Sequence, residues 1–383
     1  MAMARLTLCL LLGVAAMHLA GELPMAAANE YRVFVGTYSE GDSISKGIYT
    51  CLFNAETGTL TEPSLAVETV NPSFLAIHPN HQFLYAVNEL SSGDGAVTAF
   101  KINSDGTLTR LNEQSSLGGA PCHCNVDATG QTLLIANYSG GNVVTYPIGA
   151  DGQIGEAASN IHHSDPARKN VELHPRAHSI NISSDNRFAY AADLGLDKIF
   201  IYKLDAAHSK ISPARPASAG VAVGGGPRHF AIHPSGSFAY TNNETTLVAT
   251  AFARNPKTGA LKVIQDITTI PGGFEGTRST AECLCHPSGK FLYISNRGPD
   301  SIAVYSINEQ SGLLTWVENE STGGKTPRNF FIEPAGKWLL AENQDSDSIL
   351  VFSIDQATGA LNPTGDSIKV GKPVCIRMLP LNN

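Results

Sequence analysis

Short apolar stretches separated by turn residues recur along the chain as a repeating pattern. Each repeat reads as an apolar strand, a turn of the His-Pro-x-Gly type, a second apolar strand ending in Asn or Asp, a loop and a third strand. The alternation, as in residues 83–87 (FLYAV), favours β-strands, because successive side chains of a strand point to opposite faces. Six copies of the pattern occupy residues 71–89, 120–138, 176–194, 226–244, 279–297 and 326–344.

A seventh copy is divided between the two ends of the chain. Residues 371–379 (GKPVCIRML) supply its first half and residues 31–38 (YRVFVGTY) its second half. Seven units of four short antiparallel strands predict an all-β fold, a seven-bladed β-propeller whose first blade is closed by the N- and C-terminal strands. Closure removes strand edges that would otherwise promote aggregation. We expect turns such as 103–106 and 357–359 to end the outer strands, and an eight-bladed or open ring is the alternative.

The first 28 residues differ in kind from the rest. Arg5 precedes an apolar run from Leu6 to Ala20, and the segment ends in three alanines at 26–28. This arrangement is typical of a secretory signal peptide cleaved near Ala28, and the run is shorter than a membrane span usually needs. We therefore expect a signal peptide at 1–28, a single propeller domain at 29–383, and a periplasmic or secreted protein. A retained N-terminal anchor is the alternative.

Charge and cysteine content narrow the possible partners. The net charge of −8 and the lack of a glycine-rich phosphate loop speak against nucleic acid. No membrane partner is expected once the signal peptide is removed, and a closed ring can be stable as a monomer, which we expect. Six cysteines remain after cleavage, and we expect buried thiols. The two Cys-x-Cys pairs fall three blades apart, which disfavours disulfides between them, and neither pair has the Cys-x2-Cys spacing of a zinc site. They are Cys51, Cys122, Cys124, Cys283, Cys285 and Cys375.

Positions that agree between copies are expected to serve folding. One turn position holds His78, His233 and His286. The end of the second strand holds a short polar side chain in every full copy, and such side chains often satisfy backbone groups. These residues are Asn88, Asn137, Asp193, Asn243, Asn296 and Asn343.

Positions that differ between copies are free to form a site. Three such sets should meet at one rim of the ring, because the start of one antiparallel strand lies beside the end of the next. The first set is Ser73, Cys122, His178, Arg228, Ala281, Arg328 and Val374. The second set is Phe74, His123, Ser179, His229, Glu282, Asn329 and Cys375. The third set, directly after the shared Asn, is Thr37, Glu89, Tyr138, Leu194, Glu244, Arg297 and Gln344.

Several polar members cluster on consecutive blades, with His178 on blade 4, Arg228 and Glu244 on blade 5, and Glu282 and Arg297 on blade 6. Charged side chains are rarely buried without partners, so they could simply form a ring of ion pairs. The other interpretation is a site for an anionic substrate, with Arg228 and Arg297 as binding residues and Glu244 or His178 as base.

The chain resembles the seven-bladed propeller lactonase family, which includes the propeller-type 6-phosphogluconolactonases and the carboxy-muconate lactonising enzymes. The resemblance extends from Tyr31 to about Leu379 and depends on the order and spacing of several motifs. These are VGTY (35–38), NPSFLAIHP (71–79), LLIANYSGGNV (133–143), ADLGLDKIFIY (192–202), GPRHFAIHP (226–234), LYISNRGPDSIAVYSI (292–307) and GGKTPR (323–328).

The resemblance implies hydrolysis of a sugar lactone, most specifically 6-phospho-glucono-1,5-lactone, by general-base activation of water. It implies an active site formed by His178, Arg228, Glu244 and Arg297, with Arg278 competing for the role of the second arginine. We assign substrate binding to His123, His229, Glu282, Arg328 and Glu89. At one position the chain departs from the family pattern, because Asn329 stands where His is expected.

We expect neither a metal nor a cofactor. No Gly-x-Ser-x-Gly motif indicates a covalent nucleophile, and no acidic cluster has the spacing of a calcium site. The expected ligand is a small anionic lactone. The alternatives are a non-catalytic exported binding propeller and a muconate lactonising isomerase, because a fold alone does not settle function.

Overall fold

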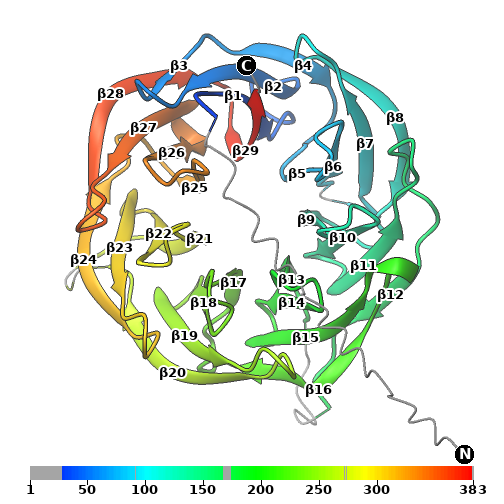
Figure 1. The fold of residues 1–383 in the computed structure, drawn as a ribbon, viewed down its shortest axis with the longest axis vertical. Helices are drawn as coiled ribbons and strands as arrows, with labels where there is room; N and C mark the ends of the chain where they lie inside the picture. Colours follow the sequence, from blue (N-terminus) through cyan, green and yellow to red (C-terminus); the bar gives the residue numbers. More distant parts are fainter. Residues whose placement is uncertain (1–27, 91, 167–173, 271, 273, 382–383) are drawn as a thin grey trace, which may run out of the picture.

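The computed structural model describes residues 28–90, 92–166, 174–270, 272 and 274–381. These residues form seven antiparallel sheets arranged radially around a central opening (Figure 1). The prediction of a seven-bladed β-propeller is therefore confirmed. The predicted signal peptide, except for Ala28, lies outside the described residues.

Blade 1 contains strands from both ends of the chain, and blades 2 to 4 follow in sequence order. Blade 1 consists of β29 (Pro373–Leu381), β1 (Glu30–Thr37), β2 (Gly47–Asn54), β3 (Thr59–Leu60) and β4 (Ser64–Glu68). Blade 2 consists of β5 (Leu75–Ile77), β6 (Phe83–Asn88), β7 (Ala96–Ile102) and β8 (Leu108–Ser115). Blade 3 consists of β9 (Pro121–Val126), β10 (Thr132–Asn137), β11 (Asn142–Pro147) and β12 (Ser159–His162). Blade 4 consists of β13 (Ala177–Ile182), β14 (Phe188–Asp193), β15 (Lys198–Asp205) and β16 (Lys210–Gly220), with the 3₁₀ helix η1 (Ala206–His208).

Blades 5 to 7 complete the ring. Blade 5 consists of β17 (Pro227–Ile232), β18 (Phe238–Asn243), β19 (Val248–Arg254) and β20 (Leu261–Thr268). Blade 6 consists of β21 (Ser279–Cys285), β22 (Phe291–Arg297), β23 (Ser301–Ile307) and β24 (Leu314–Ser321). Blade 7 consists of β25 (Pro327–Ile332), β26 (Trp338–Asn343), β27 (Ser348–Ile354) and β28 (Leu361–Lys369), with the 3₁₀ helix η2 (Gln344–Ser346).

The chain ends close the ring as the split repeat predicts. The C-terminal β29 lies innermost in blade 1 and pairs antiparallel with β1, as the red and blue strands in Figure 1 show. Every other blade also begins with its innermost strand, so the start of each repeat lines the central channel.

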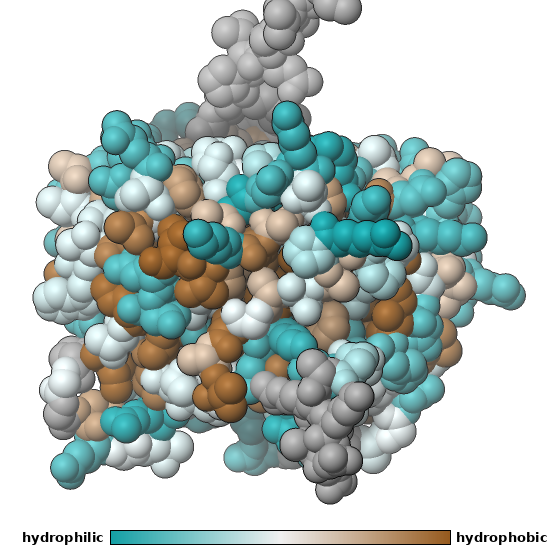
Figure 2. All heavy atoms as spheres, turned by 90° about the horizontal axis from the view of Figure 1, so that it is seen from below, coloured by the Kyte–Doolittle hydropathy of each residue, from teal (hydrophilic) through white to brown (hydrophobic). Residues whose placement is uncertain are grey.

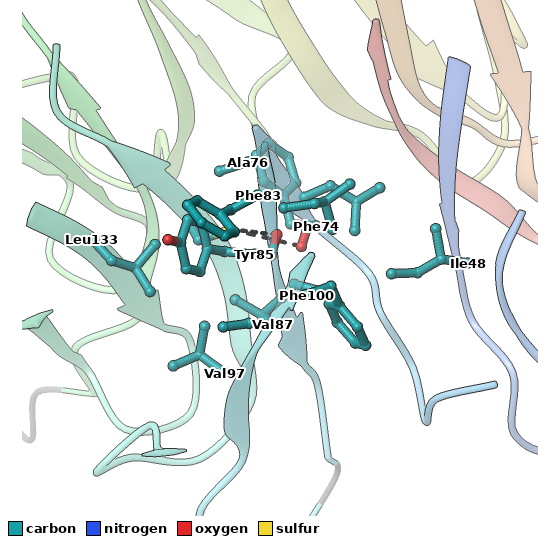
Figure 3. Close-up of a cluster of buried hydrophobic side chains, with 14 of the residues drawn as sticks. Ile48, Phe74, Ala76, Phe83, Tyr85, Val87, Val97, Phe100 and Leu133 are labelled. Atoms are coloured by element: carbon teal, nitrogen blue, oxygen red, sulfur yellow. Dashed lines mark hydrogen bonds between the residues drawn. The ribbon is translucent and has the colours of Figure 1, made fainter. Parts of the chain in front are cut away.

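The hydrophobic core lies between neighbouring blades. The second strands, such as β6 and β10, are buried at every residue because a blade covers each of their faces. Figure 3 shows one such region, where Phe83 and Tyr85 of blade 2 pack beside Leu133 of blade 3. The Tyr85 hydroxyl donates to the carbonyl of Gly152 in the next blade at 3.0 Å. Burying each large side chain contributes about 1.5–3 kcal/mol, and the hydroxyl group keeps a partner.

The fourth strands are the part of the repeat that the hydrophobic pattern does not reveal. The predicted turns 103–106 and 357–359 connect the third and fourth strands, so the expectation that they end the outer strands is wrong. The reason is that outer strands such as β8 and β20 are exposed or half-exposed at most positions and lack a regular apolar face. Figure 2 shows hydrophilic and hydrophobic residues interspersed on the side of the ring.

The residues shared between copies have structural roles. His78, His233 and His286 each contact, through Nε2, the carbonyl of a turn glycine in the next blade, at 2.9, 2.8 and 2.7 Å. Four of the shared Asn side chains bind the preceding segment, as when Asn137 Nδ2 donates to the Ser116 carbonyl at 2.8 Å, and Asn243 Nδ2 instead donates to Thr250 Oγ1 at 2.9 Å. Both assignments to structure are confirmed.

All six cysteines described by the structure are free thiols, and all are buried as predicted except Cys285, which is half-buried. Neither 3₁₀ helix, nor any other helical stretch in the described part of the chain, has the length and apolar character that a membrane-spanning segment requires.

Candidate active site

A β-bulge near the start of the innermost strand shapes the channel in six of the seven described sheets. At this point the register against the second strand slips by one residue, which leaves Cys122, His178 and Arg328 without register partners. The same slip occurs in blades 1, 5 and 6. A bulge bends the strand and re-aims its side chains. Two consecutive residues can then line one cavity, as Arg228 and His229 do.

An ion-paired cluster from blades 5 and 6 lies at one end of the channel. Arg228 Nε lies 2.9 Å from Glu244 Oε2, and Arg297 Nη2 lies 3.1 Å from the same oxygen. The Arg228 side chain is 3% exposed and that of Glu244 is 24% exposed. Arg228 also donates to the Ala281 carbonyl at 2.7 Å. One partly accessible carboxylate thus holds two guanidinium groups at what we call the mouth.

A second group of polar contacts continues around the mouth over blades 7, 1 and 2. Arg328 Nη2 donates to the Tyr38 hydroxyl at 2.8 Å, and that hydroxyl donates to Glu89 Oε2 at 2.9 Å. Ser73 Oγ donates to the same Glu89 oxygen at 2.6 Å. The sequence prediction included Arg328 and Glu89 but missed Tyr38. A signal was present, because Tyr38 is the only aromatic residue directly after a member of the third set.

A narrow cavity of about 10 Å³ lies between these two groups, which is room for about one water molecule. Cys122, His178, Arg228, Arg328 and Glu89 all line it. His178 Nδ1 lies 3.8 Å from the Cys122 sulfur, and the His178 and His229 ring centres are 5.4 Å apart. Four of the predicted residues, His178, Arg228, Arg328 and Glu89, therefore meet at one place.

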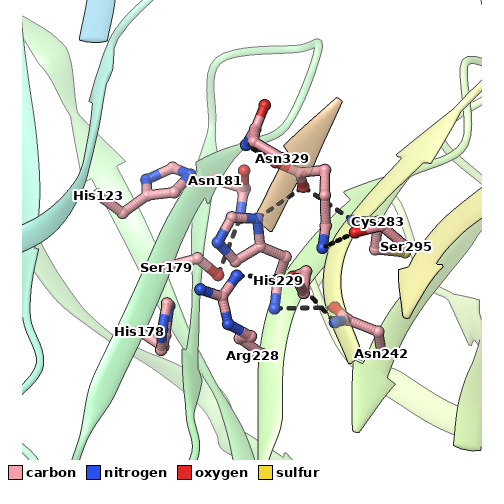
Figure 4. A network of polar contacts seen from close by, with 12 residues as sticks. His123, His178, Ser179, Asn181, Arg228, His229, Asn242, Cys283, Ser295 and Asn329 are labelled. Carbon is pink, nitrogen blue, oxygen red and sulfur yellow. Dashed lines mark hydrogen bonds and ion pairs between the residues drawn. The ribbon is translucent and has the colours of Figure 1, made fainter. Parts of the chain in front are cut away.

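The second set lies deeper in the channel than expected. His229 Nδ1 donates to Glu282 Oε1 at 2.6 Å, and Asn329 Nδ2 donates to the other oxygen. His123 stacks on Phe74 with ring centres 4.1 Å apart. His123, His229 and Glu282 line a separate cavity of about 270 Å³. In Figure 4 His123 and Asn329 lie on one side of His229, with His178 and Arg228 on the other.

The expectation that all three sets open on one rim is therefore wrong for His123 and Glu282. First-set residues line the mouth cavity, whereas Phe74, His123, His229 and Glu282 of the second set line the deeper one. Of these deeper residues, His229 reaches both cavities. Asn329, which departs from the family pattern, lines the mouth cavity and binds Glu282.

The structure brings Arg297, and not Arg278, to Glu244. Arg278 is exposed, and its Nη1 donates to the Phe274 carbonyl at 2.6 Å. Arg297 donates through Nη2 to the Thr280 carbonyl at 3.0 Å, which fixes it beside the carboxylate.

Burial and neighbouring arginines determine the protonation states of His178 and Arg297 at the mouth. Burial, with Arg228 beside the ring, holds the pKa of His178 well below its ordinary value of 6.5, so the imidazole is neutral at pH 7. Burial, reinforced by Arg228, lowers the pKa of Arg297 to about 9, which still leaves it charged at neutral pH. Three arginines and two glutamates meet here, so the mouth favours an anion.

Comparison with known proteins agrees with this arrangement. The family described as "Lactonase, 7-bladed beta-propeller" matches residues 32–378. The chain belongs to this family. It is 35% identical over 351 residues to the 6-phosphogluconolactonase of Bacillus subtilis, covering 91% of this chain and 99% of the relative. It is 33% identical over 308 residues to that of Formosa agariphila, covering 79% of this chain and 86% of the relative.

A solved structure extends the comparison to three dimensions. The structure of the periplasmic gluconolactonase of Pseudomonas aeruginosa superposes with a TM-score of 0.85 at 30% identity, covering 92% of this chain and 100% of that one. The prediction of a propeller lactonase is thus confirmed. In the part of this lactonase that the structure describes, no three His, Cys, Asp or Glu side chains come together in a way that could hold a metal ion.

Proposed function

We propose that this propeller lactonase is a hydrolase that opens a sugar lactone by general-base activation of water. The observation that carries the proposal is that His178 and Arg228 line a cavity with room for about one water molecule, while Glu244 pairs with both Arg228 and Arg297 beside it. The water oxygen bonds to the acyl carbon, and the bond from that carbon to the ring oxygen breaks. The base takes the water proton and returns it to the departing ring oxygen, which leaves a hydroxy acid.

His178 is the base in this proposal. It lines the narrow cavity, and its neutral ring has a nitrogen lone pair to accept the water proton. Glu244 is the other candidate, but its Oε2 lies within ion-pair distance of both Arg228 and Arg297. A carboxylate bound in this way is better placed to orient the two arginines than to accept a proton.

The arginines bind the substrate and stabilise the developing charge. Arg228 is buried and fixed by Glu244 and the Ala281 carbonyl, so it is preorganised for the oxyanion of the tetrahedral intermediate. Arg297 and Arg328 bind the anionic group of the substrate in this proposal, because a guanidinium group matches a phosphate or carboxylate with two hydrogen bonds. Glu89 and His229 complete the contacts, while Glu282 holds the His229 ring from the deeper layer.

The substrate we propose is 6-phospho-glucono-1,5-lactone, giving 6-phosphogluconate. The excess of arginine at the mouth and the two 6-phosphogluconolactonase relatives support a phosphorylated sugar lactone. The unphosphorylated glucono-lactone is the second candidate. It is favoured by the similarity to the Pseudomonas periplasmic gluconolactonase and by the predicted signal peptide, since the sugar-phosphate pathway is cytosolic.

We also propose that residues 1–28 direct export, so that the mature domain acts in the periplasm or outside the cell. This part of the proposal depends on the charged start, apolar centre and alanine-rich end of that segment. N-terminal sequencing of the protein recovered from the periplasmic fraction would test it, and a mature chain that still begins at Met1 would contradict it.

The enzymatic proposal can be tested by pH-stat titration with both lactones, using protein that lacks residues 1–28. Arg228→Ala and Glu244→Ala should each reduce turnover about 100-fold or more, the usual cost of removing one oxyanion donor or its support. Arg278→Ala is the matched control, because this exposed arginine lies outside the cluster, and it should retain the wild-type rate. Near wild-type rates for both mouth variants would refute the site.

The same experiment separates the alternative functions. Acid release from neither lactone would favour a binding propeller without catalytic activity. Loss of ultraviolet absorbance when a muconate is added would instead indicate a lactonising isomerase.

A further inference from the structure

The cavity of about 270 Å³ behind the mouth is formed by a fourth set of positions, three residues after the first set. Six of the seven members line it, in the way that the first set lines the mouth. These six are Ala76, Asn125, Asn181, Leu284, Phe331 and Arg377. None of them takes part in the proposed reaction, and Asn181 is the last residue of the His-Ser-x-Asn motif, so far without a role.

Arg377 brings a positive charge to this cavity without a direct ion pair, although it lies near enough to Glu282 to help lower the pKa of that carboxyl. In the described part of the chain it forms no ion pair; its Nη1 donates to the Ile376 carbonyl at 2.6 Å, and its guanidinium group lies 4.6 Å above the Phe74 ring. The Glu282 carboxylate in the same cavity is occupied by His229, Asn329 and the Cys283 amide. The Arg377 guanidinium group therefore has donors that no internal carboxylate contacts directly, and an anion in the cavity can bind them.

A second acidic residue nearby does not neutralise this charge. Glu342 is completely buried, and burial, with Glu282 adding repulsion, raises the pKa of its carboxyl group well above the ordinary value of 4.5 despite Arg377. Neither of its oxygens has a hydrogen-bond partner among the described residues. Such a group is expected to remain protonated near neutral pH.

The remaining walls combine free amides with an apolar surface. No hydrogen bond is formed by the Asn125 side chain within the described residues, and Asn181 uses only Nδ2, in a bond of 3.3 Å to Ser179 Oγ. Phe331 and Leu284 cover another part of the wall. The volume lies just below the range of about 300–1,000 Å³ that is usual for drug-sized ligands, which suits a smaller metabolite.

We propose that this cavity is a second binding site, specific for a small hydroxycarboxylate. The carboxylate pairs with Arg377, the hydroxyl groups bind the amides of Asn125 and Asn181, and the carbon chain lies against Phe331 and Leu284. The proposal does not depend on the reaction at the mouth. The two sites are separated by the layer that contains Phe74 and His229, which line both cavities.

Isothermal titration calorimetry with D-gluconate as the probe tests this proposal. The wild-type protein should bind gluconate and should not bind sorbitol, which has a similar hydroxylated chain but no charge. Asn125→Asp adds a negative charge with almost no change in shape, and it should weaken binding about ten-fold or more, as should Arg377→Gln. The Arg228→Gln variant, altered at the mouth, should still bind gluconate at the deeper site.

Three results would overturn the proposal. The first is the absence of gluconate binding to the wild-type protein at millimolar concentration. The second is equal binding by Asn125→Asp and Arg377→Gln, provided that circular dichroism shows both to be folded. The third is loss of all binding in Arg228→Gln, which would place gluconate at the mouth. A failure of lactone hydrolysis would leave the gluconate result unchanged, so the two proposals fail separately.

Discussion

The pair formed by Arg228 and Glu244 allows a test of how the mouth is held together. Because Arg228 is 3% exposed, Glu244→Gln would leave its charge buried with only carbonyl partners, and we expect a loss of about 3–5 kcal/mol in the free energy of unfolding. Arg228→Met should cost less, because Glu244 is 24% exposed and keeps Arg297 at 3.1 Å. The unequal burial of the two partners therefore predicts an unequal response.

A double-mutant cycle measured by urea unfolding gives the coupling energy. Two unit charges about 4 Å apart near a protein surface attract by about 4 kcal/mol, so we expect a coupling of about 2–4 kcal/mol between Arg228 and Glu244. Arg187→Met with Asp185→Asn is the matched control, since that pair is exposed and should couple by about 1 kcal/mol or less. Additive costs at the mouth, or a greater loss in Arg228→Met than in Glu244→Gln, would refute this reasoning.

Three further predictions concern single residues. If His178 is the base, His178→Asn should lower kcat about 100-fold to 10,000-fold. The neutral ring is the active form, so wild-type kcat/KM should stay level as the pH falls through 6.5 and should drop only below that pH. The raised pKa of Glu342 makes its ionisation unfavourable in the folded protein. The protein therefore keeps its whole free energy of unfolding below the pKa that Glu342 has in the unfolded chain, and loses part of it as the pH rises toward the pKa in the folded protein. Glu342→Gln should therefore match the wild type near pH 4 in thermal unfolding and exceed it near pH 8. His233→Ala removes a buried contact of 2.8 Å to the Gly289 carbonyl and should cost about 1–3 kcal/mol in urea unfolding, whereas His81→Ala, on an exposed turn, should change little.

The repeat pattern was sufficient to predict the blades and their closure. Each copy buries its second strand on both faces, so the apolar run from Phe83 to Val87 stands out clearly in the sequence. The outer strand β8 faces solvent and shows no such run. The turn at 103–106 was therefore predicted to follow the outer strand, whereas it precedes β8. A regular pattern of apolar residues identifies strands that are buried, and it gives no signal for strands that face solvent.

The candidate site was predicted in part for a similar reason. Comparing copies at equal positions correctly grouped His178 with Arg228, because six of the seven copies place that position at the mouth cavity. It could not show the bulge, since an extra residue present in almost every copy leaves the alignment of copies unchanged. Nor could it show that His123, one residue after Cys122, faces the deeper cavity and not the mouth.

The position of β29 as the innermost strand of blade 1 has a consequence for biosynthesis. The strand that seals the ring is made after blades 2 to 7, so those blades can form as the chain emerges, while β1 must wait for residues 373–381. A nascent chain stalled before that segment would present β1 as an unpaired edge and would also lack Arg377. The channel is therefore complete only once residues 373–381 have been made.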